Sequence, residues 1–330
     1  MEMPAVNPLP DPQTGRPFWS VMIPAYQPEA AYLRQALESV LEQAPGPERM
    51  QIEVVDDCSP GTEVAALVHS LAGERVAVSR TPRNLGLAGC WNVCIERARG
   101  EWVHLLHQDD WVLPGFYARF ETLFGTVSGL DAAFARFLVA DAGGHWQHIG
   151  FLERGTAGKL EAFDRLLATR QRMQCAAVIV KRATYERLGG FRADIPYVLD
   201  WEMWCRIAAS GSWGYVPQPG AVYRRHPQSE TERLQRSGKI LRDIPVSGRI
   251  ARANFSSELQ AQTARAFQEV VSSGILDEVR FLHAHGRYTD ALRLLHTHRR
   301  EILLSKHLPV LLGLQLRALV NLLRAPFLRK

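Results

Sequence analysis

The sequence has few cysteines, and they do not form the pattern of a disulfide framework. Five cysteines are scattered along 330 residues, whereas a disulfide-stapled protein needs an even and denser set. Cys90 and Cys94 lie four apart, without a second pair or an adjacent histidine, so a zinc site is not expected. This usage predicts a reducing compartment, and we expect a cytoplasmic protein.

The sequence also lacks a strong charge of one sign. Its 39 Lys and Arg against 34 Asp and Glu leave a formal net charge of +5. Because no continuous basic stripe with interleaved aromatic residues is present, nucleic acid is not an expected partner. Residues 1–18 are rich in proline but have neither a basic start nor an apolar core, so we expect a flexible leader and not a signal peptide.

What the sequence does contain, up to about residue 139, is an alternation of short apolar runs with helical patterns. Strands are expected at 20–24, 51–55, 75–79 and 101–106, and helices at 30–41, 63–71 and 87–97. Further strands are expected at 132–139 and 176–180, a turn at 143–144, and helices at 182–188 and 201–209. This order predicts an α/β fold with a mostly parallel sheet flanked by helices, whose ligands bind at the carboxyl ends of the strands.

After about residue 232 the whole pattern is helical. Residues 282–295 look like one helix-turn-helix hairpin of the tetratricopeptide type, although a single hairpin is no repeat array. Residues 303–323 are strongly apolar, but they include Lys306, Pro309 and Arg317, which a membrane-spanning helix rarely accepts. An amphipathic helix is therefore expected, and it either packs on the domain or, with the basic end Arg324, Arg329 and Lys330, lies on a membrane surface.

Polar residues follow the first two expected strands. Tyr26, in Pro24-Ala25-Tyr26, is placed where its ring can stack on a nucleobase or pack locally. Asp57 follows a buried apolar run, where a carboxylate needs donors or cations to offset its desolvation. It can accept from a base or ribose, or it can cap a helix.

Two further strand ends carry polar groups. The stretch from Asn84 and Gly86 to Asn92 has glycines at an expected helix N-terminus, which suits an anion or a ribose. It is not the G-x-G-x-x-G pattern of dinucleotide dehydrogenases. Asp109 and Asp110 are consecutive carboxylates after the fourth strand, and they indicate a divalent cation, Mg²⁺ or Mn²⁺, or else a solvated turn.

Together these segments resemble glycosyltransferase family 2, the inverting GT-A class, over about residues 19–231. The motifs that carry the resemblance are Val21–Tyr26, Val54–Ser59, Asn84–Asn92, Leu105–Asp110, Leu188–Phe191, Asp200–Arg206 and Tyr223–His226. The helical tail lies outside it. The chain is therefore expected to have a leader (1–18), a GT-A domain (19–231) and a helical C-terminal extension (232–330).

The resemblance implies roles for individual residues. The implied nucleotide-binding residues are Pro24, Ala25, Tyr26, Asp57, Asn84, Gly86, Asn92 and Asp109. Asp110 is similar to the direct metal ligand and His226 to a position that contacts metal or phosphate, while Asp200 matches the general base. Many relatives have an acidic residue at the position of His107. Because this chain has a histidine there, Asp109 and Asp110 are expected to bind the metal and the diphosphate.

The implied activity is the inverting transfer of a sugar from a nucleoside-diphosphate donor, UDP above all, to a glycan or lipid-linked acceptor. The processive synthases' Gln-x-x-Arg-Trp segment is missing, so polymerisation by this chain alone is not expected. Two alternatives stay open. One is a degenerate sugar-nucleotide-binding or scaffold protein, and the other is a nucleotidyltransferase, which would usually have a glycine-rich loop with an arginine after the first strand.

Overall fold

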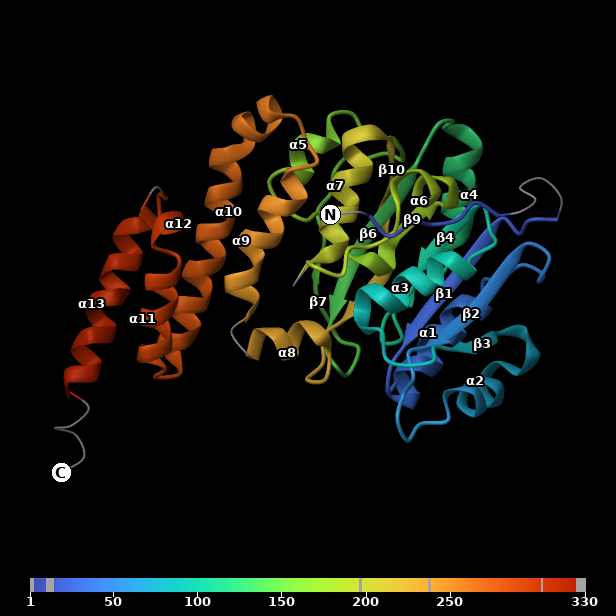
Figure 1. Ribbon diagram of the computed structural model, residues 1–330, viewed down its shortest axis with the longest axis horizontal. Coiled ribbons are helices and arrows are strands. Elements are labelled where there is room, and N and C mark those ends of the chain that lie inside the picture. Colours follow the sequence, from blue (N-terminus) through green and yellow to red (C-terminus); the bar gives the residue numbers. More distant parts are fainter. Residues whose placement is uncertain (1–2, 10–14, 196–197, 237–238, 304, 325–330) are drawn as a thin grey trace.

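The computed structural model describes residues 3–9, 15–195, 198–236, 239–303 and 305–324. A body built on one twisted sheet occupies the N-terminal two thirds, and a row of helices extends from it toward the C-terminus (Figure 1). This arrangement confirms the predicted α/β class with a C-terminal helical extension.

Ten strands form a single sheet within the described residues. They are β1 (Trp19–Ala25), β2 (Met50–Asp56), β3 (Ala77–Arg80), β4 (Trp102–Leu105), β5 (Trp111–Val112), β6 (Ala132–Ala140), β7 (Trp146–Ile149), β8 (Gly158–Lys159), β9 (Val178–Lys181) and β10 (Trp213–Arg224). Their order is β3-β2-β1-β4-β9-β6-β10-β5, with β7 beside β6 and β8 beside β10.

The sheet is parallel in its first half and mixed in its second. β3, β2, β1 and β4 run parallel, as predicted. β9 runs antiparallel to both β4 and β6, while β6 and β10 are parallel. Parallel neighbours need a crossover connection, usually a helix. Between β8 and β9 the chain forms only the five-residue α5 (Phe163–Leu167) and a 3₁₀ turn at Cys175–Ala177. The expectation of a mostly parallel sheet is therefore met only in the first half.

Helices cover both faces of the sheet (Figure 1). In the body they are α1 (Ala30–Leu41), α2 (Val64–Ala72), α3 (Gly86–Arg97), α4 (Phe116–Thr126), α5, α6 (Arg182–Leu188) and α7 (Leu199–Ser210). In β1, Val21 and Ile23 belong to the hydrophobic cluster under α1 and α4, whereas Met22 belongs to the cluster under α3 and α7. Burial of alternate residues on both faces explains why this strand is a continuous apolar run.

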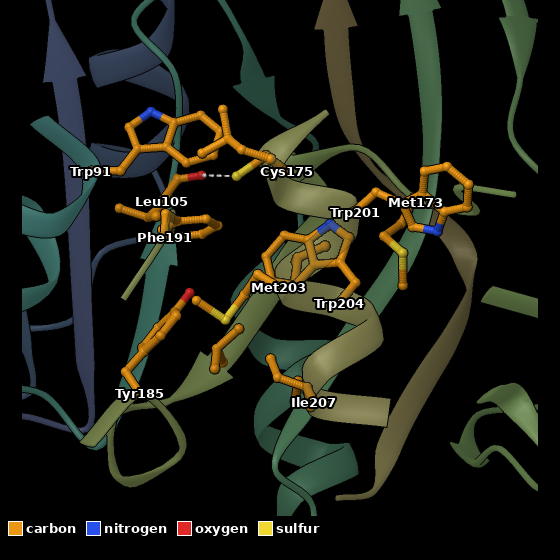
Figure 2. Packing of buried hydrophobic residues seen from close by; sticks show 14 of the residues in the cluster. Trp91, Leu105, Met173, Cys175, Tyr185, Phe191, Trp201, Met203, Trp204 and Ile207 are labelled. Atoms are coloured by element: carbon orange, nitrogen blue, oxygen red, sulfur yellow. Dashed lines mark hydrogen bonds between the residues drawn. The ribbon is translucent and has the colours of Figure 1, made fainter. Parts of the chain in front are cut away.

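The core under α3 and α7 is rich in aromatic residues. Trp91 and Phe191 pack edge to face, with ring centroids 4.8 Å apart, and Phe191 also packs edge to face on Trp204, at 6.1 Å (Figure 2). Trp201 and Met203 also point from α7 into this cluster. The N-terminal turn of α7, which contains Asp200, is therefore packed tightly against this core.

Several element boundaries differ from those expected, and two of the differences have a clear physical cause. The third strand begins at Ala77 and not at residue 75, because Gly73–Arg75 form a 3₁₀ turn that starts with a positive φ of 56° at Gly73. The last helix begins at Leu308 and not near residue 303, and this start puts Pro309 in the first helical turn, the position that suits a proline best.

The leader, predicted to be flexible, contacts the body in its described part. Val6 is buried, and the carbonyl of Pro4 accepts a hydrogen bond from the amide of Gly190. The carbonyl of Asn7 accepts from Arg182. The Asn7 amide also donates to Glu96 Oε1 at 3.3 Å. One apolar side chain and three backbone contacts thus hold residues 3–9 on the surface despite their proline content.

The C-terminal helices are α8 (Glu230–Arg236), α9 (Lys239–Arg252), α10 (Ser257–Ala284), α11 (Tyr288–Thr297), α12 (Arg299–Leu303) and α13 (Leu308–Arg324). α10 and α11 form the predicted hairpin, with Gly286 in its turn at a φ of 69°. α10 to α13 share a small core of their own that includes Ile275, Leu295 and Leu311. Phe255, before α10, belongs instead to the core of the body.

α13 packs by one face and leaves an apolar face uncovered. Leu311 and Ala318 are buried, whereas Leu312, Leu316 and Leu319 are exposed. Within the described residues, no helix has the length and apolar character that a bilayer crossing requires. Of the expected basic end, Arg329 and Lys330 lie outside the described residues, and the side chain of Arg324 is not described either.

Candidate functional site

The carboxyl end of β1 is tied to the segment after β4. The backbone amide of Tyr26 donates to Gln108 Oε1 at 2.8 Å, and Gln108 Nε2 donates back to the Tyr26 carbonyl at 3.2 Å. Pro24 and Ala25 end the strand, while the ring of Tyr26 remains 42% exposed. The structure therefore presents an accessible aromatic ring next to the segment that carries Asp109.

Asp57 is buried and joins the end of β2 to the start of α3. Its carboxylate accepts from the amides of Leu85 and Gly86, at 2.8 and 3.0 Å, and from the Thr81 hydroxyl at 3.0 Å. These bonds satisfy donors at the first turn of α3. Asp57 is thus a helix cap from a neighbouring strand, and its oxygens keep lone pairs for a further donor.

The three residues singled out on the loop and helix after β3 have separate environments. Gly86 starts α3 with a φ of 70°, and the exposed Asn84 side chain accepts from its amide at 3.0 Å. Asn92 forms a two-way pair with the backbone of Phe191, at 2.9 and 2.7 Å. This pair uses one hydrogen of the amide nitrogen and one lone pair of the oxygen, so Asn92 holds the Gly190–Phe191 turn against α3, and its role in nucleotide binding stays a prediction.

Asp109 and Asp110 lie where β10 passes the end of β4. Asp110 is buried, and its Oδ1 accepts from the backbone amide of Arg224 at 2.9 Å. The Arg224 guanidinium donates to the Asp109 carbonyl at 3.0 Å and lies 4.3 Å from the ring of Tyr32. Arg224 thereby fixes the turn that presents the two carboxylates.

His107 replaces the expected acid and takes part in the cluster. Its Nδ1 lies 3.3 Å from Asp110 Oδ2, and its ring stacks on Trp91 with centroids 5.0 Å apart. Burial opposes a charge on His107, but the neighbouring Cys175 and Asp110 outweigh it and raise the pKa of the imidazole well above its ordinary value. Burial likewise raises the pKa of Asp110, to about 6.

The donor set fits a divalent cation. His107, Asp109 and Asp110 each offer a ligand atom, and these atoms lie within 4.8 Å of one another. Asp110 Oδ2 is buried without a hydrogen-bond partner of good geometry among the described residues. A buried carboxylate oxygen without a well-aligned donor is costly, and coordination of Mg²⁺ or Mn²⁺ by this oxygen would remove the cost.

His226 reaches the cluster through Asp109. Its Nε2 lies 2.8 Å from Asp109 Oδ2, and its Nδ1 lies 3.2 Å from Gln228 Oε1. The hydrogen bond with Asp109 raises the pKa of His226. His226 was expected to contact the metal or phosphate directly. In the structure it is a hydrogen-bond partner of Asp109, and the histidine in the ligand grouping is His107.

Asp200 lies in the first turn of α7. Its Oδ1 accepts from the amide of Trp201 at 2.9 Å, and its Oδ2 accepts from the side chain of Gln171. Burial raises the pKa of Asp200, with the Trp201 hydrogen bond and the charge of His107 acting against it. The charge of His107 acts to lower the pKa of both Asp200 and Asp110, so His107 links the candidate base electrostatically to the metal-ligand grouping.

Three residues that the motifs did not single out complete the site. Gln108 binds the backbone of Tyr26, Gln171 binds Asp200, and Cys175 lies beside His107. Gln108 lies inside the Leu105–Asp110 motif, so the sequence could have indicated that it belongs to the site. Gln171 and Cys175 belong to the least patterned part of the sequence, where no spacing indicates them.

A cavity of about 580 Å³ lies elsewhere. Phe18, Glu101 and Leu130 are among the residues that line it, and each directly or almost directly precedes a strand that runs toward the site. The cavity is therefore at the amino ends of the strands, opposite the carboxylates, and it is not part of this site.

Comparisons with known proteins agree on one family. The family model described as "Glycosyl transferase family 2" matches residues 20–176. An uncharacterized protein of Mycobacterium tuberculosis is 30% identical over 239 residues, which cover 69% of this chain and 73% of that protein. The succinoglycan biosynthesis protein ExoO of Rhizobium meliloti is 32% identical over 139 residues, which cover 42% of this chain and 35% of that protein.

Solved structures show the same fold. S. aureus TarS 1–349, in complex with UDP-GlcNAc, aligns with a TM-score of 0.61 at 17% identity and covers 92% of this chain and 88% of that one. GalNAc-T7 with UDP, GalNAc and Mn²⁺ aligns with a TM-score of 0.50 at 18% identity and covers 64% of this chain and 45% of that one. The protein described here has a GT-A fold and belongs to glycosyltransferase family 2.

Proposed function

We propose that the chain is an inverting glycosyltransferase that moves a hexosyl or N-acetylhexosaminyl group from a UDP-sugar to a hydroxyl of a glycan or lipid-linked glycan. The observation that carries the proposal is the grouping of His107, Asp109 and Asp110 beyond the carboxyl end of β4, with Asp200 near enough for the charge of His107 to lower its pKa. UDP is supported by the UDP complexes of TarS and GalNAc-T7. A glycan acceptor is supported by the names of ExoO and of the putative teichuronic acid glycosyltransferase TuaG of Bacillus subtilis.

In this proposal the donor lies across the ends of β1, β2 and β4. The exposed ring of Tyr26 stacks on the base, and Asp57 accepts from the base with its remaining lone pairs. Asp109 and Asp110 face the diphosphate. Asp110 and its neighbours would hold Mg²⁺ or Mn²⁺, which when bound offsets the negative charge of the departing diphosphate.

The chemical step assigned to this chain's own residues is one proton transfer. Asp200 takes the proton of the acceptor hydroxyl while the hydroxyl oxygen attacks the anomeric carbon from the side opposite the diphosphate. The carbon–oxygen bond to the diphosphate breaks as the new bond forms, so the anomeric configuration inverts. Gln171 and the Trp201 amide hold the carboxylate in place.

Binding of nucleoside diphosphates by calorimetry tests the proposed donor site. We expect UDP to bind more tightly with Mn²⁺ than with EDTA, because the cation links the diphosphate to Asp110. Tyr26→Ala should weaken UDP binding by about 1–3 kcal/mol, the usual value of one base on an aromatic ring. Leu87→Ala, which truncates another exposed apolar side chain near the site, serves as the control. If UDP, GDP and dTDP all fail to bind with either addition, the donor site is refuted.

The uncovered face of α13 leads to a second proposal, contact with an anionic membrane at the cytoplasmic side. Leu312, Leu316 and Leu319 form an apolar stripe that stays exposed among the described residues. Arg317 lies on the same helix, and the sequence continues to the basic end at Lys330. An apolar helix face flanked by basic residues is the form that binds at a membrane interface.

Flotation with vesicles containing anionic lipid tests this contact. The full chain should float, and Leu316→Asp should reduce the floated fraction because it places a charge in the apolar stripe. Leu166→Asp adds the same charge at an exposed leucine of α5 and should float like the unchanged chain. Equal flotation of all three proteins, or none of any, removes the proposal.

A further inference from the structure

We propose that the C-terminal extension is a positioning element of the active site, and that Asn254 is the residue through which it holds the helix of the catalytic base. This inference rests on the proposed role of Asp200. The helices after β10 would then help to orient the catalytic base during transfer.

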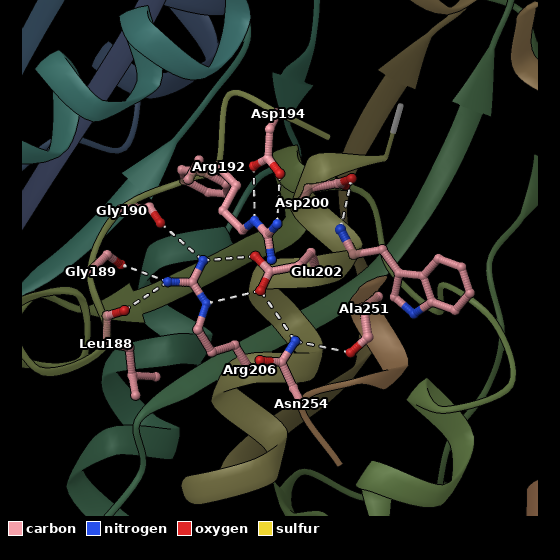
Figure 3. A network of polar contacts seen from close by, with 12 residues as sticks. Leu188, Gly189, Gly190, Arg192, Asp194, Asp200, Glu202, Arg206, Ala251 and Asn254 are labelled. Atoms are coloured by element: carbon pink, nitrogen blue, oxygen red, sulfur yellow. Dashed lines mark hydrogen bonds and ion pairs between the residues drawn. The ribbon is translucent and has the colours of Figure 1, made fainter. Parts of the chain in front are cut away.

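The helix that carries Asp200 is built around a buried ion pair. Glu202 is fully buried and pairs with Arg206 one turn later, at 2.8 Å. Arg206 also donates to the carbonyls of Leu188 and Gly190, at 2.7 and 2.9 Å (Figure 3). A buried carboxylate is stable only while such partners remain, so the place of Glu202 is closely determined.

The extension supplies a further donor to this pair. Asn254, between α9 and α10, directs its Nδ2 to Glu202 Oε1 at 3.2 Å and to the carbonyl of Ala251 at 3.0 Å (Figure 3). The second bond fixes the side chain on the extension, and the first reaches a residue two positions after Asp200. Asn254 is therefore a direct link between the extension and the first turns of α7.

The extension also packs against Trp201, the residue between Asp200 and Glu202. Gly248 of α9 comes so close that a Cβ atom there would lie 3.1 Å from the Trp201 ring and 2.6 Å from the ring of Phe267. Phe267 belongs to α10, and its ring lies 6.2 Å from that of Trp201, centroid to centroid. The extension thus contacts both residues that follow Asp200.

These contacts bear on catalysis because Asp200 takes its orientation from the same turn. Its Oδ1 accepts from the Trp201 amide, so a shift of residue 201 moves the carboxylate. A displacement on the order of 1 Å at a reacting group can cost about 100-fold in rate. Contacts remote from the donor can therefore set the rate of transfer without changing nucleotide binding.

Asn254→Asp tests the proposal, with Gln262→Glu as a matched control. The first change puts a carboxylate against Glu202 of the base helix. The second puts a carboxylate against Glu258, which Gln262 contacts at 2.9 Å on the exposed surface of α10. We expect Asn254→Asp to lower kcat for transfer about tenfold, a fraction of the 100-fold cost above, while UDP affinity with Mn²⁺ stays within about twofold. Gln262→Glu should leave both unchanged.

A double variant separates positioning from mere structure. If Asn254 acts through Asp200, adding Asn254→Asp to Asp200→Asn should lower the residual rate no further, because residues of one unit are not additive. A full additional loss in the double variant, or an unchanged kcat in folded Asn254→Asp, would overturn the proposal. If instead Asp200→Asn alone keeps the native rate, it is the assignment of the base that fails. Melting temperatures identify variants whose loss is one of folding, and for an unfolded Asn254→Asp the same comparisons are made with Asn254→Ala.

Discussion

Replacement of Asp200 by asparagine is expected to lower glycosyl transfer by roughly 100-fold or more, the usual scale for loss of a general base, while UDP affinity stays unchanged. Asparagine keeps the size of the side chain and can still accept from the Trp201 amide. It cannot take a proton. The loss should therefore appear in kcat measured with acceptor present.

Asp194→Asn is the matched control for this change. Asp194 lies in the segment that leads to α7 and pairs with Arg192 on the surface, and its loss should leave transfer nearly native. Glu202 cannot stand in for Asp200, because it is fully buried and bound to Arg206. A folded Asp200→Asn enzyme with a near-native rate would show that Asp200 only starts a helix.

The pH dependence of transfer follows from the environment of Asp200. Burial raises its pKa above the ordinary value of aspartate. The base acts only when it is deprotonated, so kcat should fall as the pH is lowered toward this raised pKa, earlier than an exposed aspartate would dictate. A rate that stays constant down to the ordinary range of aspartate, near pH 4, would contradict the assignment.

Replacement of Asp110 by asparagine should have its largest effect on binding. We expect UDP affinity in the presence of Mn²⁺ to fall by at least about tenfold, since even partners outside the ligand shell of a metal are worth 10- to 100-fold. UDP affinity in EDTA should hardly change. Calorimetry under both conditions measures the difference.

Glu29→Gln provides the control for Asp110. Glu29 is an exposed acid that follows β1 at the same edge of the sheet, so its loss removes a nearby charge without touching the carboxylate cluster. An Asp110→Asn protein that keeps metal-dependent UDP binding would exclude Asp110 as the ligand. Asp109 and His107 would then be the remaining candidates in the cluster.

The sequence predicts the first half of the fold well for a physical reason. β1, β2 and β4 are buried on both faces, so each is mainly apolar, although β2 also contains the buried Gln51 and Glu53 and β4 the buried His104. No pattern in the sequence indicated that β9 runs antiparallel to its neighbours. Three of its four residues, Val178, Ile179 and Val180, are apolar, and they would be apolar whether the neighbouring strands were parallel or antiparallel.

The site divides in the same way. The places of Tyr26, Asp110 and Asp200 in the fold were predictable because each follows or begins an element with a clear pattern, while their roles stay predictions. Asn92 stands in an equally clear motif, yet its amide pairs with the backbone of Phe191, 99 residues later. Gln171 reaches Asp200 from a loop without pattern. Contacts between distant segments of this kind depend on packing, which local spacing does not encode.

The central claim is that this family 2 chain is an active transferase whose cation site and base act separately. Release of nucleoside diphosphate from a panel of UDP-, GDP- and dTDP-sugars, with Mn²⁺ or with EDTA, tests it most directly. The account predicts slow, Mn²⁺-dependent release of UDP from at least one UDP-sugar without acceptor, and loss of this release in Asp110→Asn. Nucleotide binding with no release from any donor would contradict it and would indicate a sugar-nucleotide-binding protein without transferase activity.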